Sequence, residues 1–303
     1  MAPRIRQKFT WPAPNLDPPK TPSIDATYTA KPLPRPPPSA GSPAILRAIE
    51  RYPHLFNHTI ELDMTQYTRL MADHPNQPWA NSFIDSLTHG WWPCHSGEPS
   101  QPKVAKGQQF PSVPQTDEDR DFIQALVEKQ VANGWISPSF DDHIDGIEYN
   151  EIFVNRRPGK KPRCVNNQNQ SGHNDEIDID DCPITMDTVT DLLRILRHLH
   201  FLTPERAQAM ADAWKFDIKA AFKSMCMHRW WQARVAILVA YRQPEGSPVK
   251  WVFKRHIEWR AAFGTRASPF LWTALNSSFM WICQFHAKIE RPLAYIDTGW
   301  AST

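Results

Sequence analysis

Two aspartates at the ends of predicted strands could support catalysis. Asp217 lies in segment 214–218, where apolar and polar residues alternate, and Asp297 closes the segment 295–297. Alternation with a period of two predicts a strand with one buried face. Two carboxylates from different strands that meet at one sheet edge can hold a pair of Mg²⁺ ions about 4 Å apart. We therefore expect phosphoryl-transfer chemistry that uses two metal ions.

A glycine turn that opens a helix stands between these aspartates in the sequence. The run 263–269 reads Phe-Gly-Thr-Arg-Ala-Ser-Pro, and its end predicts a helix beginning at Ser268-Pro269. Gly264 has no side chain, so its backbone could approach a templating base closely.

Basic residues are concentrated in the short segment 156–163, at Arg156, Arg157, Lys160, Lys161 and Arg163. A guanidinium group binds phosphate through two parallel hydrogen bonds, which suits a triphosphate site. A solvated hairpin is the alternative interpretation of such a charge run, and both stay open.

In this order, the segments resemble the motifs of reverse transcriptases. Residues 214–222 are similar to the first metal-binding strand of that family, and 263–269 to its template- and primer-gripping helix. Residues 295–297 resemble its Tyr-x-Asp-Asp hairpin, and 152–166 its fingers pattern of an apolar strand, a basic turn and Arg. The motifs span about residues 115 to 297. Details such as Gly90-Trp-Trp-Pro93 resemble fungal retrotransposon proteins.

The resemblance implies a role for each matching residue. Asp217 and Asp297 would be the catalytic metal ligands, assisted by the carbonyl of Ile218, and two Mg²⁺ ions would be the cofactors. Phe222 would exclude a 2′-hydroxyl, so that the product is DNA, although a simple core position is the alternative for it. The other nucleotide-binding residues would be Arg156, Lys160, Arg163, Phe263 and Gly264. The implied partners are dNTP and an RNA or DNA template-primer.

The sequence departs from the family pattern at two positions. Thr298 stands where the second aspartate of the hairpin is expected, and Asn166 where the family usually has Asp. Losing a carboxylate beside a dication is a large electrostatic change. We also expect the outgoing strand of the hairpin and the thumb to be missing, as in a degenerate or truncated retroelement polymerase. Little activity is therefore expected of the chain alone.

Two readings outside catalysis remain open. In the first, the chain is catalytically dead but still binds nucleic acid through 156–163. In the second, the Pro-rich leader and the Trp-rich extension bind protein partners, and the rest is a scaffold. Twelve of the first 43 residues are proline, which favours an extended, disordered segment that could bind a protein partner.

The elements expected around these residues define an α+β fold with right-hand polymerase fingers and a partial palm, in which an antiparallel sheet packs on helices. We predict a disordered leader at 1–43, a helical extension and linker at 44–115, fingers at 116–213 and a partial palm at 214–303. A helix should begin at Thr116 with a capping box to Asp119.

Bulk properties limit the possible classes. The formal net charge is +2, so nucleic-acid binding must depend on local clusters. Five scattered cysteines without a CxxC pair argue against a disulfide framework and suit a reducing compartment. No apolar run reaches 18 residues, so we expect no membrane span and an intracellular location.

Overall fold

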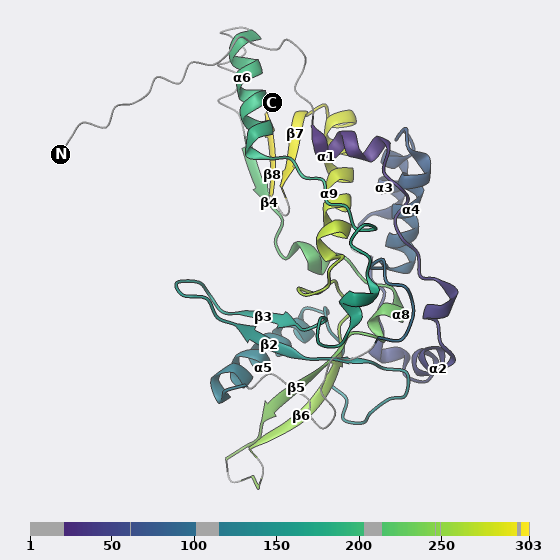
Figure 1. Cartoon of the computed structure of the whole chain (residues 1–303), viewed down its shortest axis with the longest axis vertical. Helices are drawn as coiled ribbons and strands as arrows, with labels where there is room; N and C mark the ends of the chain where they lie inside the picture. Colours follow the sequence, from purple (N-terminus) through teal and green to yellow (C-terminus); the bar gives the residue numbers. More distant parts are fainter. Residues whose placement is uncertain are drawn as a thin grey trace, which may run out of the picture. The chain divides into compact units, whose positions relative to one another are not determined.

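The computed structural model describes residues 21–60, 62–100, 115–202, 214–245, 247–248, 250–295 and 298–302. The chain forms two compact units from interleaved segments. The smaller contains 1–28, 185–217 and 276–303, and the larger contains 29–184 and 218–275. Both mix helices and strands (Figure 1), as the α+β expectation requires at this coarse level. The unit boundaries differ from those predicted from the sequence.

Three N-terminal helices belong to the larger unit. These are α2 (Pro43–Arg51), α3 (Met64–Met71) and α4 (Gln77–His89), and the side chain of the residue before each accepts a backbone hydrogen bond at its N-terminus. From α2, Ile45 and Ala48 pack in one core with Ala236 and Ile257. The predicted helical extension therefore shares its core with strands that lie far along the chain.

The strands of the larger unit form two small sheets beside α5 (Asp117–Ala132). The sheet β1-β5-β6 consists of β1 (Tyr149–Asn150), β5 (Ala236–Arg242) and β6 (Trp251–Ile257), and β2 (Ile152–Asn155) pairs with β3 (Arg163–Asn166). Helix α5 begins with the predicted capping box and ends at Asn133. Its Ile123 and Val127 pack against β2 and β5.

Segment 147–155 reads in the sequence as one short strand, but the structure divides it. Its first part, β1, pairs parallel with β5, and its second part, β2, pairs antiparallel with β3. The residue between them, Glu151, is 1% exposed, and its carbonyl accepts a hydrogen bond from the amide of Asn167 at 2.6 Å. That bond continues the register of the β2–β3 pair by one residue. The parallel pairing of β1 with β5 departs from the antiparallel sheet that was expected.

The aromatic turn after α4 is buried. Trp91 and Trp92 are each 1% exposed, and Gly90 has φ +100°, where a Cβ would lie 2.5 Å from the backbone of His228. The short helix α8 (Arg229–Gln232) contributes Trp231, whose ring lies 6.0 Å from that of Trp92. These tryptophans are core residues, and their rings pack inside the larger unit.

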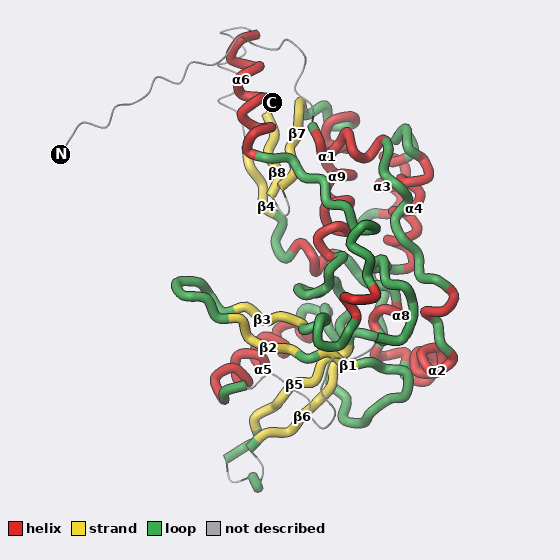
Figure 2. The backbone as a smooth tube through the Cα atoms, viewed as in Figure 1, coloured by secondary structure: helices red, strands yellow, loops and turns green. Residues whose placement is uncertain are grey.

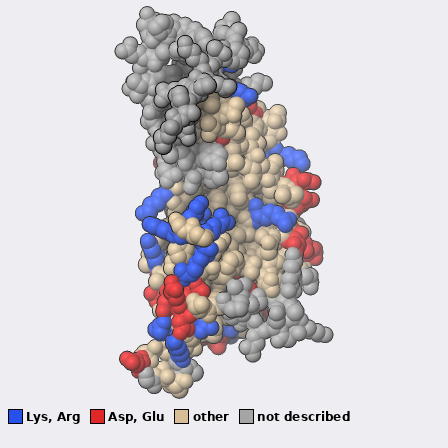
Figure 3. Space-filling view, turned by 60° about the vertical axis from the view of Figure 1, so that its left-hand side comes forward, with Lys and Arg blue, Asp and Glu red and all other residues tan. Residues whose placement is uncertain are grey.

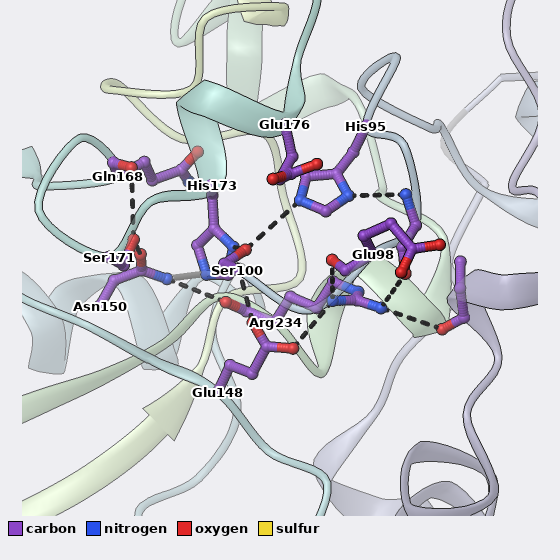
Figure 4. A network of polar contacts seen from close by, with 12 residues as sticks. His95, Glu98, Ser100, Glu148, Asn150, Gln168, Ser171, His173, Glu176 and Arg234 are labelled. Carbon is purple, nitrogen blue, oxygen red and sulfur yellow. Dashed lines mark hydrogen bonds and ion pairs between the residues drawn. The ribbon is translucent and has the colours of Figure 1, made fainter. Parts of the chain in front are cut away.

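Arg234, which follows Trp231 closely in the sequence, is part of a buried polar network (Figure 4). Arg234 donates to Glu148 and to the Gly97 carbonyl, each at 2.8 Å. Ser100 and Glu148 both contact Nδ1 of His173. A nucleophilic triad uses both ring nitrogens, whereas Nε2 of His173 is buried without a partner among the described residues. Burial and the charge of Arg234 lower the pKa of His173 to about 3, so the network is structural.

The smaller unit contains the sheet β4-β8-β7, formed by β4 (Trp214–Asp217), β8 (Thr298–Ser302) and β7 (Glu290–Tyr295). Helix α6 (Val189–Leu202) packs on it through Ile195 and Leu293. The expectation that the outgoing strand of the hairpin is missing is wrong. β8 is that strand, and it pairs antiparallel with β4 on one side and β7 on the other.

The predicted leader is partly ordered. Helix α1 (Pro22–Asp25) joins the smaller unit, where Ser23 donates to Asp187 through its amide at 2.9 Å and its hydroxyl at 2.5 Å. Asp187 also accepts from the amide of Ala294 at 2.7 Å. In the larger unit, Leu33 is 4% exposed. The prediction of disorder is therefore wrong for 21–43, and residues 1–20 lie outside the described part.

The remaining elements complete the chain. Helix α9 (Ser268–Phe285) begins at the predicted residue and ends before the predicted Ile289. Short 3-10 helices occur at Ala26–Tyr28, Pro38–Ala40, Pro53–Leu55, His173–Glu176 and Ala221–Ser224. The helix predicted from Thr203 lies outside the described residues. Within the described segments, no helix combines the length and apolar character needed to cross a membrane.

Candidate functional site

The register of the smaller sheet pairs Asp217 with the residue that follows Asp297 in the sequence. Asp217, the last residue of β4, pairs with Thr298, the first residue of β8. Thr298 also pairs with Tyr295, the last residue of β7. Only Ile296 and Asp297 connect β7 to β8, and both lie outside the described residues. Paired Cα atoms stand about 5 Å apart, so the backbone of Thr298 neighbours that of Asp217. Asp297 directly precedes Thr298 in the sequence.

Thr298 occupies the register position where a second hairpin carboxylate would stand. The candidate donors named from the sequence, Asp217, Asp297 and the carbonyl of Ile218, would all supply oxygen ligands. Such oxygens are the ligands that Mg²⁺ prefers. The set therefore fits magnesium in kind, with one carboxylate replaced by a neutral hydroxyl. Among described residues, no group of three or more His, Cys, Asp and Glu could hold a metal.

The glycine turn of the larger unit is fixed against the end of β3. The amide of Asn166 donates to the Phe263 carbonyl at 3.0 Å. Gly264 has φ +123°, and a Cβ there would lie 2.0 Å from the Asn166 carbonyl oxygen. Glycine was expected here to let a templating base approach. The structure gives a reason within the chain itself, because the backbone of β3 already fills the space.

The same turn is also held by the loop 174–182, which carries five acidic residues. Nδ2 of Asn174 donates to the Gly264 carbonyl at 2.8 Å, and the amide of Arg266 donates to Oδ1 of Asn174 at 2.9 Å. Arg266 also donates through Nη1 to the Ile177 carbonyl at 2.9 Å. Nothing in the sequence indicated Asn174, because 90 residues separate it from Gly264.

The two phenylalanines predicted to contact the nucleotide lie together. The ring centroids of Phe222 and Phe263 are 5.0 Å apart with an interplanar angle of 52°. Phe263 is 60% exposed and Phe222 is half-buried. An exposed phenylalanine beside a glycine turn is an apolar surface available to a ligand, and Phe222 is not the fully buried core residue of the alternative interpretation.

A buried ion pair connects these segments, and sequence reasoning missed it. Nζ of Lys223 lies 3.3 Å from Oε1 of Glu258, and Nδ2 of Asn166 donates to Oε2 of Glu258 at 2.9 Å. Lys223 is 8% exposed and Glu258 6%. Aspartate at 166 would put a second buried carboxylate against Glu258, with one lysine to balance both. This network gives a physical reason for Asn166 in place of the family's aspartate.

In the basic segment 156–163, Arg156 is paired with carboxylates, whereas the other cations form no ion pair with a described residue. Nη2 of Arg156 lies 2.9 Å from Asp119 and 3.1 Å from Glu118, so a phosphate would have to displace both carboxylates. The segment 156–162 extends beyond β2 and β3 as a loop (Figure 2). Four exposed cations form no ion pair with a described residue: Arg157, Lys160 and Lys161 in this loop and Arg163 at the start of β3. Figure 3 shows Lys and Arg side chains gathered on this side, above a group of acidic ones.

We expect Gly264→Ala to destabilise the chain strongly, by about 3 kcal/mol or more, because the new Cβ meets backbone at a strained φ. Gly159→Ala is the matched control, since Gly159 has φ +71° with nothing within 4 Å of its Cβ position. The control should cost only about 1–2 kcal/mol of backbone strain. Urea unfolding of both variants measures the difference, and equal losses would contradict the close approach.

Compared with known proteins, the chain matches no protein-family model, and no curated protein matches it.

Proposed function

We propose that the chain carries out template-directed nucleotidyl transfer of the reverse-transcriptase type, with a weakened metal site. The observation that supports this proposal is the pairing of Asp217 with Thr298, the residue that follows Asp297 in the sequence. Two-metal transfer requires two carboxylates at one sheet edge. The order of the motifs along the chain supports the same conclusion.

Each residue has one role in this proposal. Asp217, Asp297 and the Ile218 carbonyl hold magnesium, which when bound neutralises phosphate charge and orients the attacking and leaving oxygens. Lys160 and Arg163 bind the triphosphate as free cations of the hairpin. The exposed ring of Phe263 contacts the nascent base pair, and Phe222 lies under the sugar.

Thr298 makes the activity weak. A threonine hydroxyl carries no charge, so the site holds one fewer negative charge than the family pattern provides. The gripping turn and the rings are formed regardless, because Asn166, Asn174 and the Lys223–Glu258 pair hold them. The proposed defect of the metal site is therefore local, and one substitution should improve it.

We expect Thr298→Asp to raise primer extension with Mg²⁺, dNTP and an RNA template by at least about tenfold, equivalent to about 1.4 kcal/mol. The added carboxylate supplies the missing charge next to Asp217. Ser302→Asp is the matched control, since it adds the same charge at the other end of β8, and it should change nothing.

The gain must depend on Asp217, so Asp217→Asn combined with Thr298→Asp should abolish extension. No gain in Thr298→Asp, or a gain that survives loss of Asp217, would overturn the proposal. Robust synthesis by the unmodified chain would refute its weak-activity part.

Nucleic-acid binding without synthesis is a second candidate function, favoured by the four unpaired cations of the hairpin. Each cation that neutralises a phosphate releases a counterion, so binding weakens as salt rises. This function needs neither Asp217 nor Asp297.

We expect Lys160→Ala and Arg163→Ala each to reduce the slope of log Kd against log salt by about one. Arg156→Ala is the control, because Arg156 is held by Asp119 and Glu118, and it should leave the slope nearly unchanged. Fluorescence anisotropy with a labelled RNA–DNA duplex measures the slopes. Similar slopes in all three variants would argue against a phosphate-binding hairpin.

A further inference from the structure

Two of the five cysteines lie against each other in the larger unit. The thiols of Cys94 and Cys182 are in hydrogen-bonding contact. Sγ of Cys94 also lies 3.5 Å from the carbonyl oxygen of Asp181, the residue before Cys182. The two sulfurs are therefore neighbours although 88 positions separate them in the sequence (182 minus 94).

The backbone on both sides holds this contact in place. His95 and Ile177 form an antiparallel bridge, and the amide of Ser96 donates to the Glu176 carbonyl at 2.9 Å. The hydroxyl of Ser96 donates to Oε2 of Glu176 at 2.7 Å. Segment 94–96 thus runs beside the loop 174–182, and this keeps Cys94 next to the backbone of Asp181.

The surroundings of the pair make one sulfur the better nucleophile. The hydrogen bond from Cys94 lowers the pKa of Cys182 and outweighs its burial. The charge of Arg266 also lowers this pKa, against the charges of Asp181 and Asp178, which raise it. That hydrogen bond and burial raise the pKa of Cys94. Thiolate is the form that reacts with oxidants, so Cys182 reacts first and Cys94 is placed to resolve the product.

We propose that Cys94 and Cys182 form a reversible disulfide when the chain meets a peroxide oxidant. The Cys182 thiolate attacks one oxygen of hydrogen peroxide, the O–O bond breaks and hydroxide leaves, which gives a sulfenic acid. The Cys94 sulfur then attacks Cys182, the S–S bond forms, the S–O bond breaks, and the hydroxide leaves with the Cys94 proton as water. The cysteines lose two electrons, and peroxide is reduced to two waters, the second formed with the proton that Cys182 released.

The disulfide would fix the loop that holds the glycine turn. Asn174 and Ile177 bind Gly264 and Arg266, and Cys182 ends the same loop. Oxidation ties this loop to the segment after Trp92, while reducing thiols release it. This modification site is independent of the proposed function, because it uses neither aspartate.

The test is peptide mapping of the full chain after brief exposure to hydrogen peroxide. Free thiols are blocked with N-ethylmaleimide, and the chain is cut with trypsin and a glutamate-specific protease. Cleavage at Glu176 separates Cys164 from Cys182. We expect one crosslinked pair containing Cys94 and Cys182, and the thiol count in denaturant should fall from five to three. Dithiothreitol should restore five.

Two variants test which cysteines form the disulfide and which of them reacts first. Cys164→Ser is the matched control, because burial raises the pKa of the Cys164 thiol to about 12, and its thiol count should still fall by two. In Cys94→Ser the resolving sulfur is gone, so Cys182 should stop as a sulfenic acid that dimedone labels. Retention of all five thiols in the unmodified chain, or a crosslink between other cysteines, would overturn the proposal.

Discussion

The pairing of β8 between β4 and β7 is the interaction on which the account depends. A central strand is hydrogen-bonded on both edges, so a shift by one residue would turn every side chain to the opposite face. The register aligns Asp217 with Thr298 and Thr298 with Tyr295. Asp297 directly precedes Thr298 in the sequence and lies outside the described residues. The proposed chemistry follows from this register together with the nature of the two residues.

Local signals allowed much of the fold to be predicted. The capping box of Thr116 and Asp119 defined the start of α5, and Ser268-Pro269 defined that of α9. The alternation at 214–217 predicted β4. Such features depend on neighbouring residues, so sequence alone reveals them. The division of the strand at Glu151 was not predictable, because its two parts pair with different strands, β1 with β5 and β2 with β3.

The candidate site shows the same limit. Phe222, Phe263 and Gly264 were predicted from their motifs, and the structure brings them together with Asn166. The Lys223–Glu258 pair and the Asn174 clamp were not predicted, since their partners are separated by 35 and 90 residues. β8 was missed for a different reason. The departure at Thr298 from the family pattern was taken as the end of the hairpin, although Gly299, Trp300 and Ala301 still pair as a strand.

Binding of Mn²⁺, followed by electron paramagnetic resonance in the absence of nucleic acid, tests the central claim most directly. Mn²⁺ accepts the same oxygen ligands as Mg²⁺. If Asp217 and Asp297 share one site, Asp217→Asn and Asp297→Asn each weaken binding, and the double variant loses less than the sum of the two in free energy. Independent, additive losses, or a loss from only one aspartate, would contradict the account.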